Sequence, residues 1–193
     1  MVAVESTMLP LGTKAPPFEL ADHSGAVWRS SDHENAPALV VMFICNHCPY
    51  VKHIADVLAT VTSQFIRRGA TVVAINSNDA HEYPDDGPGK MAEEVRARGY
   101  EFPYLRDESQ VVAKAYRAAC TPDFFVFDGD QRLVYRGQFC DARPANDVKV
   151  TGRDLTAAVD AVLSGQEYSG PQKPSIGCNI KWKPGNEPDY QDL

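Results

Sequence analysis

Residues 41–53 read VMFICNHCPYVKH, and they contain the side chains of this sequence that are best suited to chemistry. Cys45 and Cys48 are separated only by Asn46 and His47, a spacing at which two sulfurs can alternate between a dithiol and a disulfide. Three interpretations compete: a redox centre, half of a metal site, or two small buried side chains that happen to lie close together.

The position of the pair in the chain favours redox chemistry. An apolar run ends at Cys45, and a helix is expected to begin at once, which places the sulfur near unsatisfied N–H groups at the positive end of a helix dipole. That environment stabilises a thiolate, so we expect Cys45 to be the attacking, more exposed thiol, with a lowered pKa. Cys48 would then close the disulfide, and His47 would stabilise the Cys45 thiolate further.

A metal site is the weaker interpretation. Zinc requires about four ligands, and the remaining candidates, Cys120 or Cys178 with His53, do not form a second close pair. Two inert core cysteines are less favoured still, because a junction between a strand and a helix activates a thiol. We therefore predict that Cys45 and Cys48 are catalytic, with no metal and no other cofactor.

The elements expected around the pair are those of an α/β protein. Residues 38–44 and 70–76 are continuously apolar and rich in β-branched side chains, which indicates buried strands. Apolar residues recur at helical spacing over 49–68, so the three segments form a parallel β-α-β unit. Further expected elements are a hairpin within 18–32, a helix at about 90–98, an extended piece at 103–107, a helix over 109–119, a hairpin from 124–128 to 132–139 and a helix over 153–165.

Two polar segments have no clear period. The loop over 77–89 contains Asp79, Asp85 and Asp86, which we interpret as solvated acids rather than as a cation site. The tail after residue 165 is rich in proline and glycine, and we expect it to wrap the surface as an irregular extension.

Three stretches resemble those of a known family: GTKAPPFEL near the N-terminus, the strand–CNHC–helix segment, and CTPDFFVFDGD at 120–130. Together they resemble the thioredoxin-like branch of the alkyl hydroperoxide reductase/thiol-specific antioxidant superfamily, over roughly residues 10–165. The tail GCNIKWKPGNEP also resembles that of bacterial members described as thiol-disulfide isomerases. The resemblance implies a thioredoxin-like fold, with a central mixed β-sheet flanked by helices and an N-terminal hairpin. It also implies a single domain over 1–193, with an irregular C-terminal extension, 166–193, packed on the core.

The same resemblance implies roles for further residues. Pro122 would follow a cis peptide bond, face the cysteine pair and lie where backbone groups bind a substrate chain. A histidine at the place of His47 also occurs in protein disulfide isomerases, which implies a weaker reductant than a thioredoxin. The supporting residues are therefore Asn46, His47, Thr121 and Pro122, and the candidates for additional redox thiols are Cys120 and Cys178. Cys140 has no expected role beyond packing.

Two departures from the family pattern narrow the expected activity. Leu39 stands where thioredoxins carry a buried aspartate, so the proton acceptor for Cys48 is not identified. The peroxiredoxin pattern P-x-x-x-T-x-x-C is absent, because the places of its threonine and proline hold Met42 and Ala38 before Cys45, and Cys45 and Val41 before Cys48. We therefore expect a thiol-disulfide oxidoreductase acting on protein or small-molecule disulfides. The alternatives are a thiol peroxidase with an antioxidant role and a non-enzymatic redox sensor or binding module.

Composition narrows the expected partners. With a net charge of −7, the chain is not expected to bind nucleic acid or an anionic membrane non-specifically. No apolar run is long enough to span a membrane, and the N-terminus does not resemble a signal peptide, so we expect a cytoplasmic protein. The expected partners are a disulfide-containing substrate and an unidentified dithiol reductant or oxidant. The expected state is a monomer or a small homo-oligomer.

Overall fold

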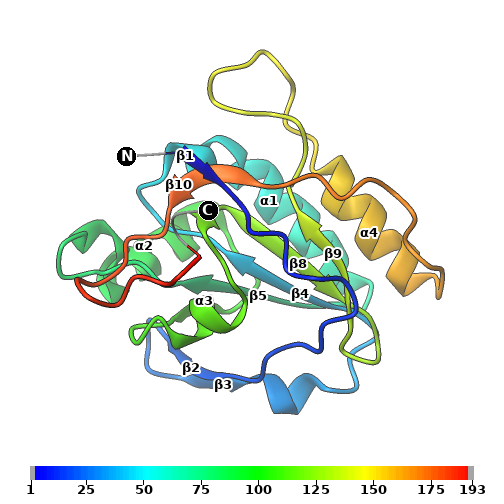
Figure 1. Cartoon of the computed structure of the whole chain (residues 1–193), viewed down its shortest axis with the longest axis horizontal. Coiled ribbons are helices and arrows are strands. Elements are labelled where there is room, and N and C mark those ends of the chain that lie inside the picture. Colours follow the sequence, from blue (N-terminus) through cyan, green and yellow to red (C-terminus); the bar gives the residue numbers. More distant parts are fainter. Residues whose placement is uncertain (1–2, 191–193) are drawn as a thin grey trace.

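A seven-stranded sheet forms the centre of the protein in the computed structural model, which describes residues 3–190. Its strand order is β3-β2-β6-β5-β4-β8-β9 (Figure 1). β4 (Leu39–Phe43) and β5 (Thr71–Asn76) are parallel and are joined by α1 (Pro49–Arg67), as the predicted β-α-β unit requires. β8 (Asp123–Phe127) pairs antiparallel with the other edge of β4, so the strand that leads to Cys45 is central and fully buried.

The outer strands form the predicted hairpins. β8 turns into β9 (Leu133–Gly137), and β2 (Glu19–Asp22) pairs with β3 (Val27–Arg29). β6 (Tyr104–Arg106) is parallel to β5 and antiparallel to β2, and it thereby joins the N-terminal hairpin to the rest of the sheet. The sheet is therefore mixed, with its parallel strands in the middle.

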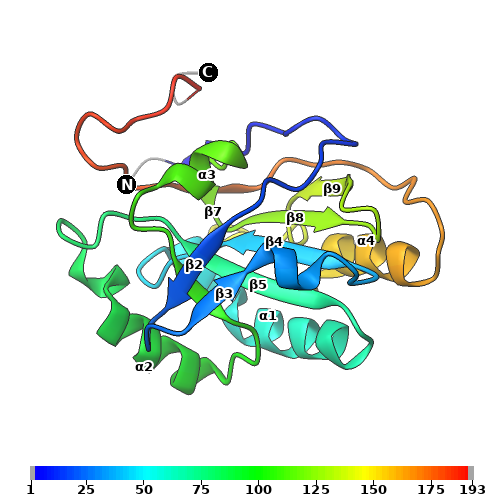
Figure 2. The ribbon, with the colours of Figure 1, turned by 90° about the horizontal axis from the view of Figure 1, so that it is seen from below.

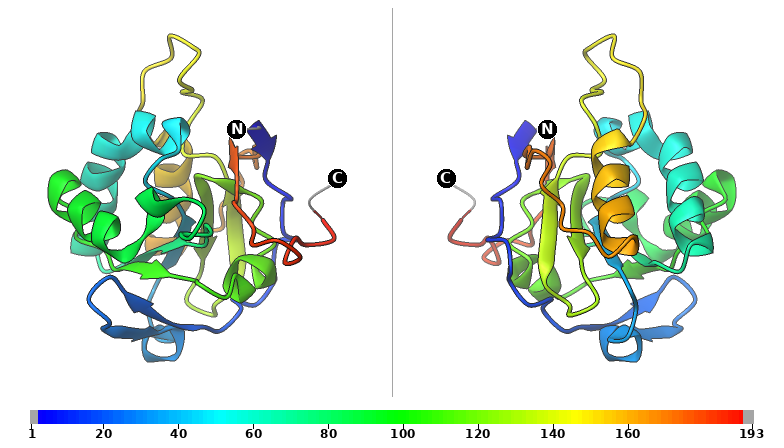
Figure 3. Two further views of the ribbon diagram at one scale, coloured as in Figure 1. Left: turned by 90° about the vertical axis from the view of Figure 1, so that its left-hand side faces the viewer. Right: turned by 90° about the vertical axis from the view of Figure 1, so that its right-hand side faces the viewer.

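Helices cover the sheet and bury a separate apolar cluster on each face. α1 and α4 (Arg153–Leu163) lie on one face, where Leu155 belongs to the first cluster. The other face is covered by α3 (Val111–Ala115), the N-terminal segment and the tail, and this cluster includes Tyr116 and Ile180. Figures 2 and 3 show the sheet between these two layers. The predicted mixed sheet flanked by helices is therefore confirmed.

The helix limits follow the predictions with one exception. α2 (Pro88–Arg98) ends before Gly99, much as expected. α3 is shorter than the predicted 109–119, because Gln110 at its start and Arg117 beyond its end both adopt left-handed backbone angles. Two short 3-10 helices complete the set, η1 (Ser30–His33) and η2 (Pro84–Asp86). In the part of the chain that the structure describes, no helix is long and apolar enough to cross a bilayer.

A small second sheet brings both ends of the described chain together beside the core. Its order is β1 (Ala3–Glu5), β10 (Ile176–Asn179) and β7 (Cys120–Thr121), and both pairings are antiparallel. Figure 1 shows β1, in blue, and β10, in orange, side by side. The sequence does not predict β1 or β10, because strands of three and four residues are too short to show a period. Most of the tail is irregular, as expected, but β10 pairs with β1 on one edge and with β7 on the other.

Candidate active site

The cysteine pair lies between the end of β4 and the start of α1. Cys48 is the N-cap residue of α1, and Pro49 takes the first helical position, where a missing N–H is tolerated. Both cysteines are buried, with exposed fractions of 1% for Cys45 and 0% for Cys48. Because both residues are buried, exposure does not distinguish the two thiols, and the expectation that Cys45 is the more exposed one stays a prediction.

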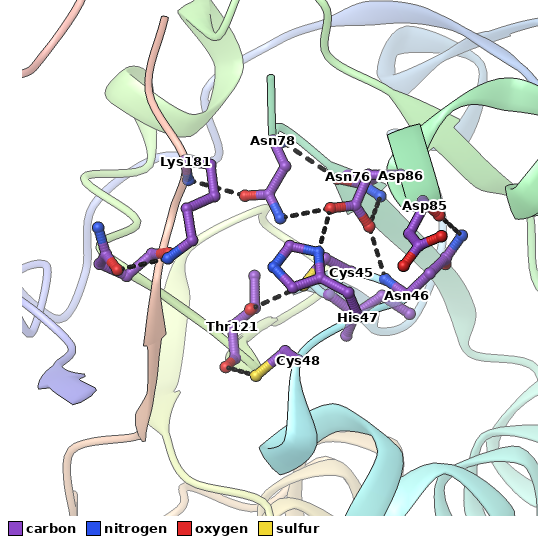
Figure 4. A network of polar contacts seen from close by, with 12 residues as sticks. Cys45, Asn46, His47, Cys48, Asn76, Asn78, Asp85, Asp86, Thr121 and Lys181 are labelled. Atoms are coloured by element: carbon purple, nitrogen blue, oxygen red, sulfur yellow. Dashed lines mark hydrogen bonds and ion pairs between the residues drawn. The ribbon is translucent and has the colours of Figure 1, made fainter. Parts of the chain in front are cut away.

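Thr121 and Pro122 contact the pair, as predicted. The Thr121–Pro122 peptide bond is cis. The Cys45 Sγ and the Thr121 Oγ1 are hydrogen-bonded at 3.2 Å, and the Thr121 carbonyl oxygen lies 3.2 Å from the Cys48 Sγ. One residue therefore contacts both sulfurs, through its side chain and its main chain (Figure 4).

The two thiols have opposite pKa shifts. A hydrogen bond from Cys45 is the largest cause that lowers the pKa of Cys48, to about 5, and it outweighs the burial that opposes ionisation. Further interactions with Cys178 and with the N–H of Val51, in the first turn of α1, also lower it. Burial, the hydrogen bond to Cys48 and the charge of Asp86 together raise the pKa of Cys45 well above its usual range. The direction of the Cys45 shift is therefore opposite to the expectation, whereas the pKa of Cys48 is lowered.

Asp86 is the polar centre of the site, although its side chain is only 1% exposed. Its carboxylate accepts hydrogen bonds from His47 Nδ1 (2.6 Å), Asn46 N (2.8 Å), Asn78 Nδ2 (2.8 Å) and Asn76 Nδ2 (3.1 Å). Burial acts to raise the pKa of this carboxyl group, but the bonds from His47, Asn78 and Asn46 outweigh it and lower the pKa. Asp86 is therefore a carboxylate that accepts four hydrogen bonds next to the dithiol.

His47 is held between Asp86 and Tyr83. Its Nδ1 donates to the Asp86 carboxylate, and its ring stacks on Tyr83 with a centroid separation of 5.3 Å and an interplanar angle of 11°. Its other nitrogen, Nε2, is buried and makes no hydrogen bond to the described residues. The ring is thus fixed in place, with one nitrogen left for a proton transfer or for a bound group.

Asn46 connects the CNHC segment to the loop that contains Asp86 through a hydrogen bond. Its Nδ2 donates to the backbone oxygen of Asp85 at 2.8 Å, and its Oδ1 accepts from the hydroxyl of the buried Tyr104 at 3.0 Å. Every residue between the two cysteines therefore has a defined contact with η2 or its surroundings.

The loop acids are not the solvated residues that the sequence suggests. Asp86 and Asp79 are buried, and only Asp85 matches the prediction. A signal for this was present in the sequence: Asn76 and Asn78 follow a buried strand that runs parallel to the one before Cys45. The carboxyl ends of parallel neighbouring strands meet at one edge of a sheet, so polar residues there converge on the cysteine pair.

Three residues of the site could also serve as metal ligands. The Cys45 sulfur, a His47 ring nitrogen and an Asp86 carboxylate oxygen all lie within 4.8 Å of one another. His53, one of the ligands considered from the sequence, is exposed on α1 and is not in this group. A metal ion bound to both His47 Nδ1 and Asp86 would have to replace the 2.6 Å hydrogen bond between them.

The comparisons with known proteins now identify the family. A family model described as AhpC/TSA matches residues 11–136. The chain belongs to the AhpC/TSA family. It is 54% identical to an uncharacterized conserved protein from Geobacillus kaustophilus, with 96% of this chain and 98% of that chain covered and a TM-score of 0.93. A hypothetical protein from Sinorhizobium meliloti 1021 is 52% identical, with 94% and 99% covered and a TM-score of 0.92. The comparison with curated proteins gave no match.

A more distant structure confirms the predicted fold class of this AhpC/TSA protein. It is described as a thiol:disulfide interchange protein of the thioredoxin family from Chlorobium tepidum, with 19% identity, 79% and 97% coverage and a TM-score of 0.60. At that identity the likeness concerns the fold alone. Family membership together with the buried dithiol identifies the protein as a thiol oxidoreductase.

The other cysteines of this AhpC/TSA chain are also buried, and they differ in their relation to the pair. Cys178 hydrogen-bonds with Cys48, whereas Cys140 packs in the cluster on the α1 face. Cys120 lies in β7, and its pKa is raised well above the usual range by burial, then by the charges of Asp123 and Cys48. Within residues 3–190, which include all five cysteines, none forms a disulfide in this structure.

Asp123 is a further buried acid to which the sequence analysis gave no role. It follows Pro122 in β8, and burial raises the pKa of its carboxyl group well above the usual range. Its Oδ1 accepts from the N–H of Phe124, while its Oδ2 has no hydrogen-bond partner among the described residues. The usual signal for such an acid, an aspartate at the place of Leu39, is absent from this chain.

Proposed function

We propose that this protein is a thiol-disulfide oxidoreductase in which Cys45 and Cys48 exchange electrons with disulfide-containing substrates. The observation that carries the proposal is the placement of two thiols at the start of α1, where both sulfurs contact Thr121 and the pKa of Cys48 is lowered. A nucleophile and a resolving thiol in direct contact are what disulfide exchange requires.

The exchange balances without a cofactor. The thiolate of the pair attacks one sulfur of the substrate disulfide and forms a mixed disulfide, and the second substrate sulfur leaves as a thiol. The other cysteine of the pair then loses its proton and attacks the mixed disulfide, which closes the Cys45–Cys48 bond and releases the second substrate thiol. The pair is oxidised by two electrons, and the substrate disulfide is reduced to two thiols.

We infer that Cys48 holds the first thiolate, because its pKa is lowered whereas that of Cys45 is raised. Thr121 faces both sulfurs and can exchange hydrogen bonds as the charge moves between them. Because both sulfurs are buried, a substrate reaches them only after a local opening of the covering segments.

A peroxidase is the second candidate, and one contact favours it. The Thr121 hydroxyl lies 3.2 Å from the Cys45 Sγ, so a hydroxyl group is present beside a candidate peroxidatic sulfur although the family threonine before Cys45 is replaced by Met42. In that reaction a peroxide would oxidise one cysteine to a sulfenic acid, and the other would resolve it as a disulfide with loss of water.

Stopped-flow mixing of the fully reduced protein separates the two candidates. We expect faster oxidation by a small aromatic disulfide than by hydrogen peroxide at equal concentration, followed through the release of the aromatic thiol and through intrinsic fluorescence. Cys45→Ala and Cys48→Ala should each abolish formation of the Cys45–Cys48 disulfide, while Cys140→Ala serves as the matched control. A peroxide reaction faster than the disulfide reaction would overturn the proposal in favour of the peroxidase.

A further inference from the structure

The tail strand β10 lies directly beside the residues that face the cysteine pair. In the antiparallel register, Cys178 is opposite Thr121 and Asn179 is opposite Cys120. The N–H of Ile180 continues the pairing by donating to the oxygen of Ala119 at 3.0 Å. The edge of β7 next to the dithiol is thereby taken by the protein's own tail, and the far edge of β10 is covered by β1.

Gly177 lets the tail approach this closely. A Cβ at residue 177 would lie 2.0 Å from the carbonyl oxygen of Thr121 and 3.1 Å from the nitrogen of Pro122. Only a residue without a side chain fits so near another backbone. The next residue, Cys178, is thus placed against the site by main-chain contacts.

Cys48 and Cys178 are both next to Thr121 as a result. The Cys48 Sγ is 3.2 Å from the carbonyl oxygen of Thr121, the residue whose partner across the strand pair is Cys178. Interactions with Cys45 and with Cys178 both lower the pKa of Cys48. Cys178 is itself buried, so its interaction with Cys48 is internal to the molecule.

The tail also makes hydrogen bonds to the polar residues around Asp86. The N–H of Lys181 donates to Asn78 Oδ1 at 2.8 Å, and Asn78 Nδ2 donates to the Asp86 carboxylate at 2.8 Å. The oxygen of Lys181 accepts from the N–H of Asp79 at 2.8 Å. A chain of contacts therefore runs from the tail through Asn78 and Asp86 to His47 (Figure 4).

We propose that Cys178 is a third redox-active thiol, which β10 holds in the position of a substrate sulfur so that Cys48 can form a disulfide with either Cys45 or Cys178. The inference rests on the proposed function, because that activity supplies the Cys45–Cys48 disulfide from a disulfide oxidant. It also explains why the edge of β7 is filled: an extended polypeptide would add there by main-chain pairing, and the tail supplies such a strand with its own cysteine.

The exchange conserves atoms and electrons. Starting from the Cys45–Cys48 disulfide, Cys178 loses its proton and attacks the Cys48 sulfur. The Cys48–Cys178 bond forms, the Cys45–Cys48 bond breaks, and Cys45 leaves as a thiolate that takes up a proton. The number of disulfides is unchanged, so no further oxidant or reductant is needed.

The test uses Cys45→Ala, which leaves Cys48 with only the proposed partner. Reduced full-length protein is treated with oxidised glutathione, quenched in acid and mapped by peptide mass spectrometry. We expect the Cys48–Cys178 linked peptide as the main product, with Cys120 and Cys140 still reduced. The matched double variant Cys45→Ala/Cys178→Ala should instead retain glutathione on Cys48. Persistent glutathione on Cys48 in the single variant, or a link from Cys48 to Cys120, would overturn the inference.

A second measurement covers the case in which the variant does not fold. Wild-type protein oxidised by less than one equivalent of oxidised glutathione should yield both the Cys45–Cys48 and the Cys48–Cys178 peptides, whereas Cys178→Ala should yield only the first. If the wild type forms only Cys45–Cys48, the inference fails and the proposed function stands. If no linked peptide forms in any variant, the proposed function fails as well.

Discussion

The pKa of Cys48 is lowered by two thiols, those of Cys45 and Cys178, and by the backbone N–H groups of Val51 and Cys178. The helix start contributes the N–H of Val51, but the thiols of Cys45 and Cys178 come from a strand end and from the tail. The lowered pKa is therefore a property of three chain segments, and a single substitution in any of them should change it.

The first residue-scale prediction concerns the pH dependence of the thiolate. Because the pKa of Cys48 is about 5, the ultraviolet absorbance of a thiolate should appear with a midpoint near that pH in the reduced protein. Cys45→Ala removes the largest favourable hydrogen bond, so the midpoint should rise. Cys48→Ala should abolish the low-pH transition. A transition that survives in Cys48→Ala and disappears in Cys45→Ala would assign the thiolate to Cys45 instead.

The second prediction concerns the charge of Asp86. Asp86→Asn keeps the size of the side chain but leaves several of its donors without a good acceptor, which should lower the free energy of unfolding by about 1–3 kcal/mol. It also removes a charge that raises the pKa of Cys45, so that pKa should fall. Urea denaturation and the pH dependence of alkylation measure the two effects.

Asp85→Asn is the matched control for this prediction, because the Asp85 side chain is exposed and only its backbone oxygen contacts Asn46. Folding lowers the pKa of Asp86, so its contribution to stability is present at neutral pH and is lost as the pH falls through that lowered value. The stability of Asp86→Asn should therefore fall less in acid than that of the wild type. Equal stability and equal acid sensitivity in Asp86→Asn and Asp85→Asn would contradict this role.

At the scale of elements, the site depends on where two parallel strands end. Cys45 follows the end of β4, Asn76 is the last residue of β5 and Asn78 comes just after it. Thr121 lies in the short strand β7. η2 then brings Asp86 against His47. The site is therefore built from four segments, β4, β5, η2 and β7, and the tail is a fifth.

Gly177→Ala tests the role of β10. The new methyl group would overlap the Thr121 carbonyl oxygen, so the strand pair must separate. A loss of about 1.4 kcal/mol in the docking of the tail corresponds to a roughly tenfold faster alkylation of Cys178 in the native reduced protein. Gly89→Ala, in α2, is the control, because a Cβ there would meet nothing within 4 Å. An unchanged alkylation rate in Gly177→Ala would show that β10 does not depend on this close approach.

At the scale of the whole molecule, the strands and helices of the core could be predicted because they are long and strongly patterned. The buried β4, β5 and α1 follow from continuous or periodic apolar runs, and the cis bond before Pro122 follows from the family resemblance. The division into one domain over residues 1–193, the redox role of His47 and the cytoplasmic location stay predictions.

The parts that could not be predicted are those set by long-range contacts. The acid Asp86 looks like a loop residue until Asn46, His47 and Asn78 converge on it. The lowered pKa of Cys48, which the sequence analysis expected for Cys45, also depends on Cys178. Cys178 is 130 residues away from Cys48 in the chain (178 − 48). No local sequence pattern predicts the contacts of Asp86 or the pKa of Cys48, because both depend on how the tail and η2 pack over the cysteine pair.

The measurement that tests the central claim most directly is a count of thiols after reaction with a disulfide. The chain has five cysteines, and the account predicts that excess oxidised glutathione followed by denaturing alkylation leaves three alkylated, with no glutathione retained. Cys45→Ala/Cys48→Ala should keep its three remaining thiols under the same conditions. Five alkylated cysteines in the wild type, or an equal loss of two thiols in the double variant, would contradict the claim that Cys45 and Cys48 form the redox centre.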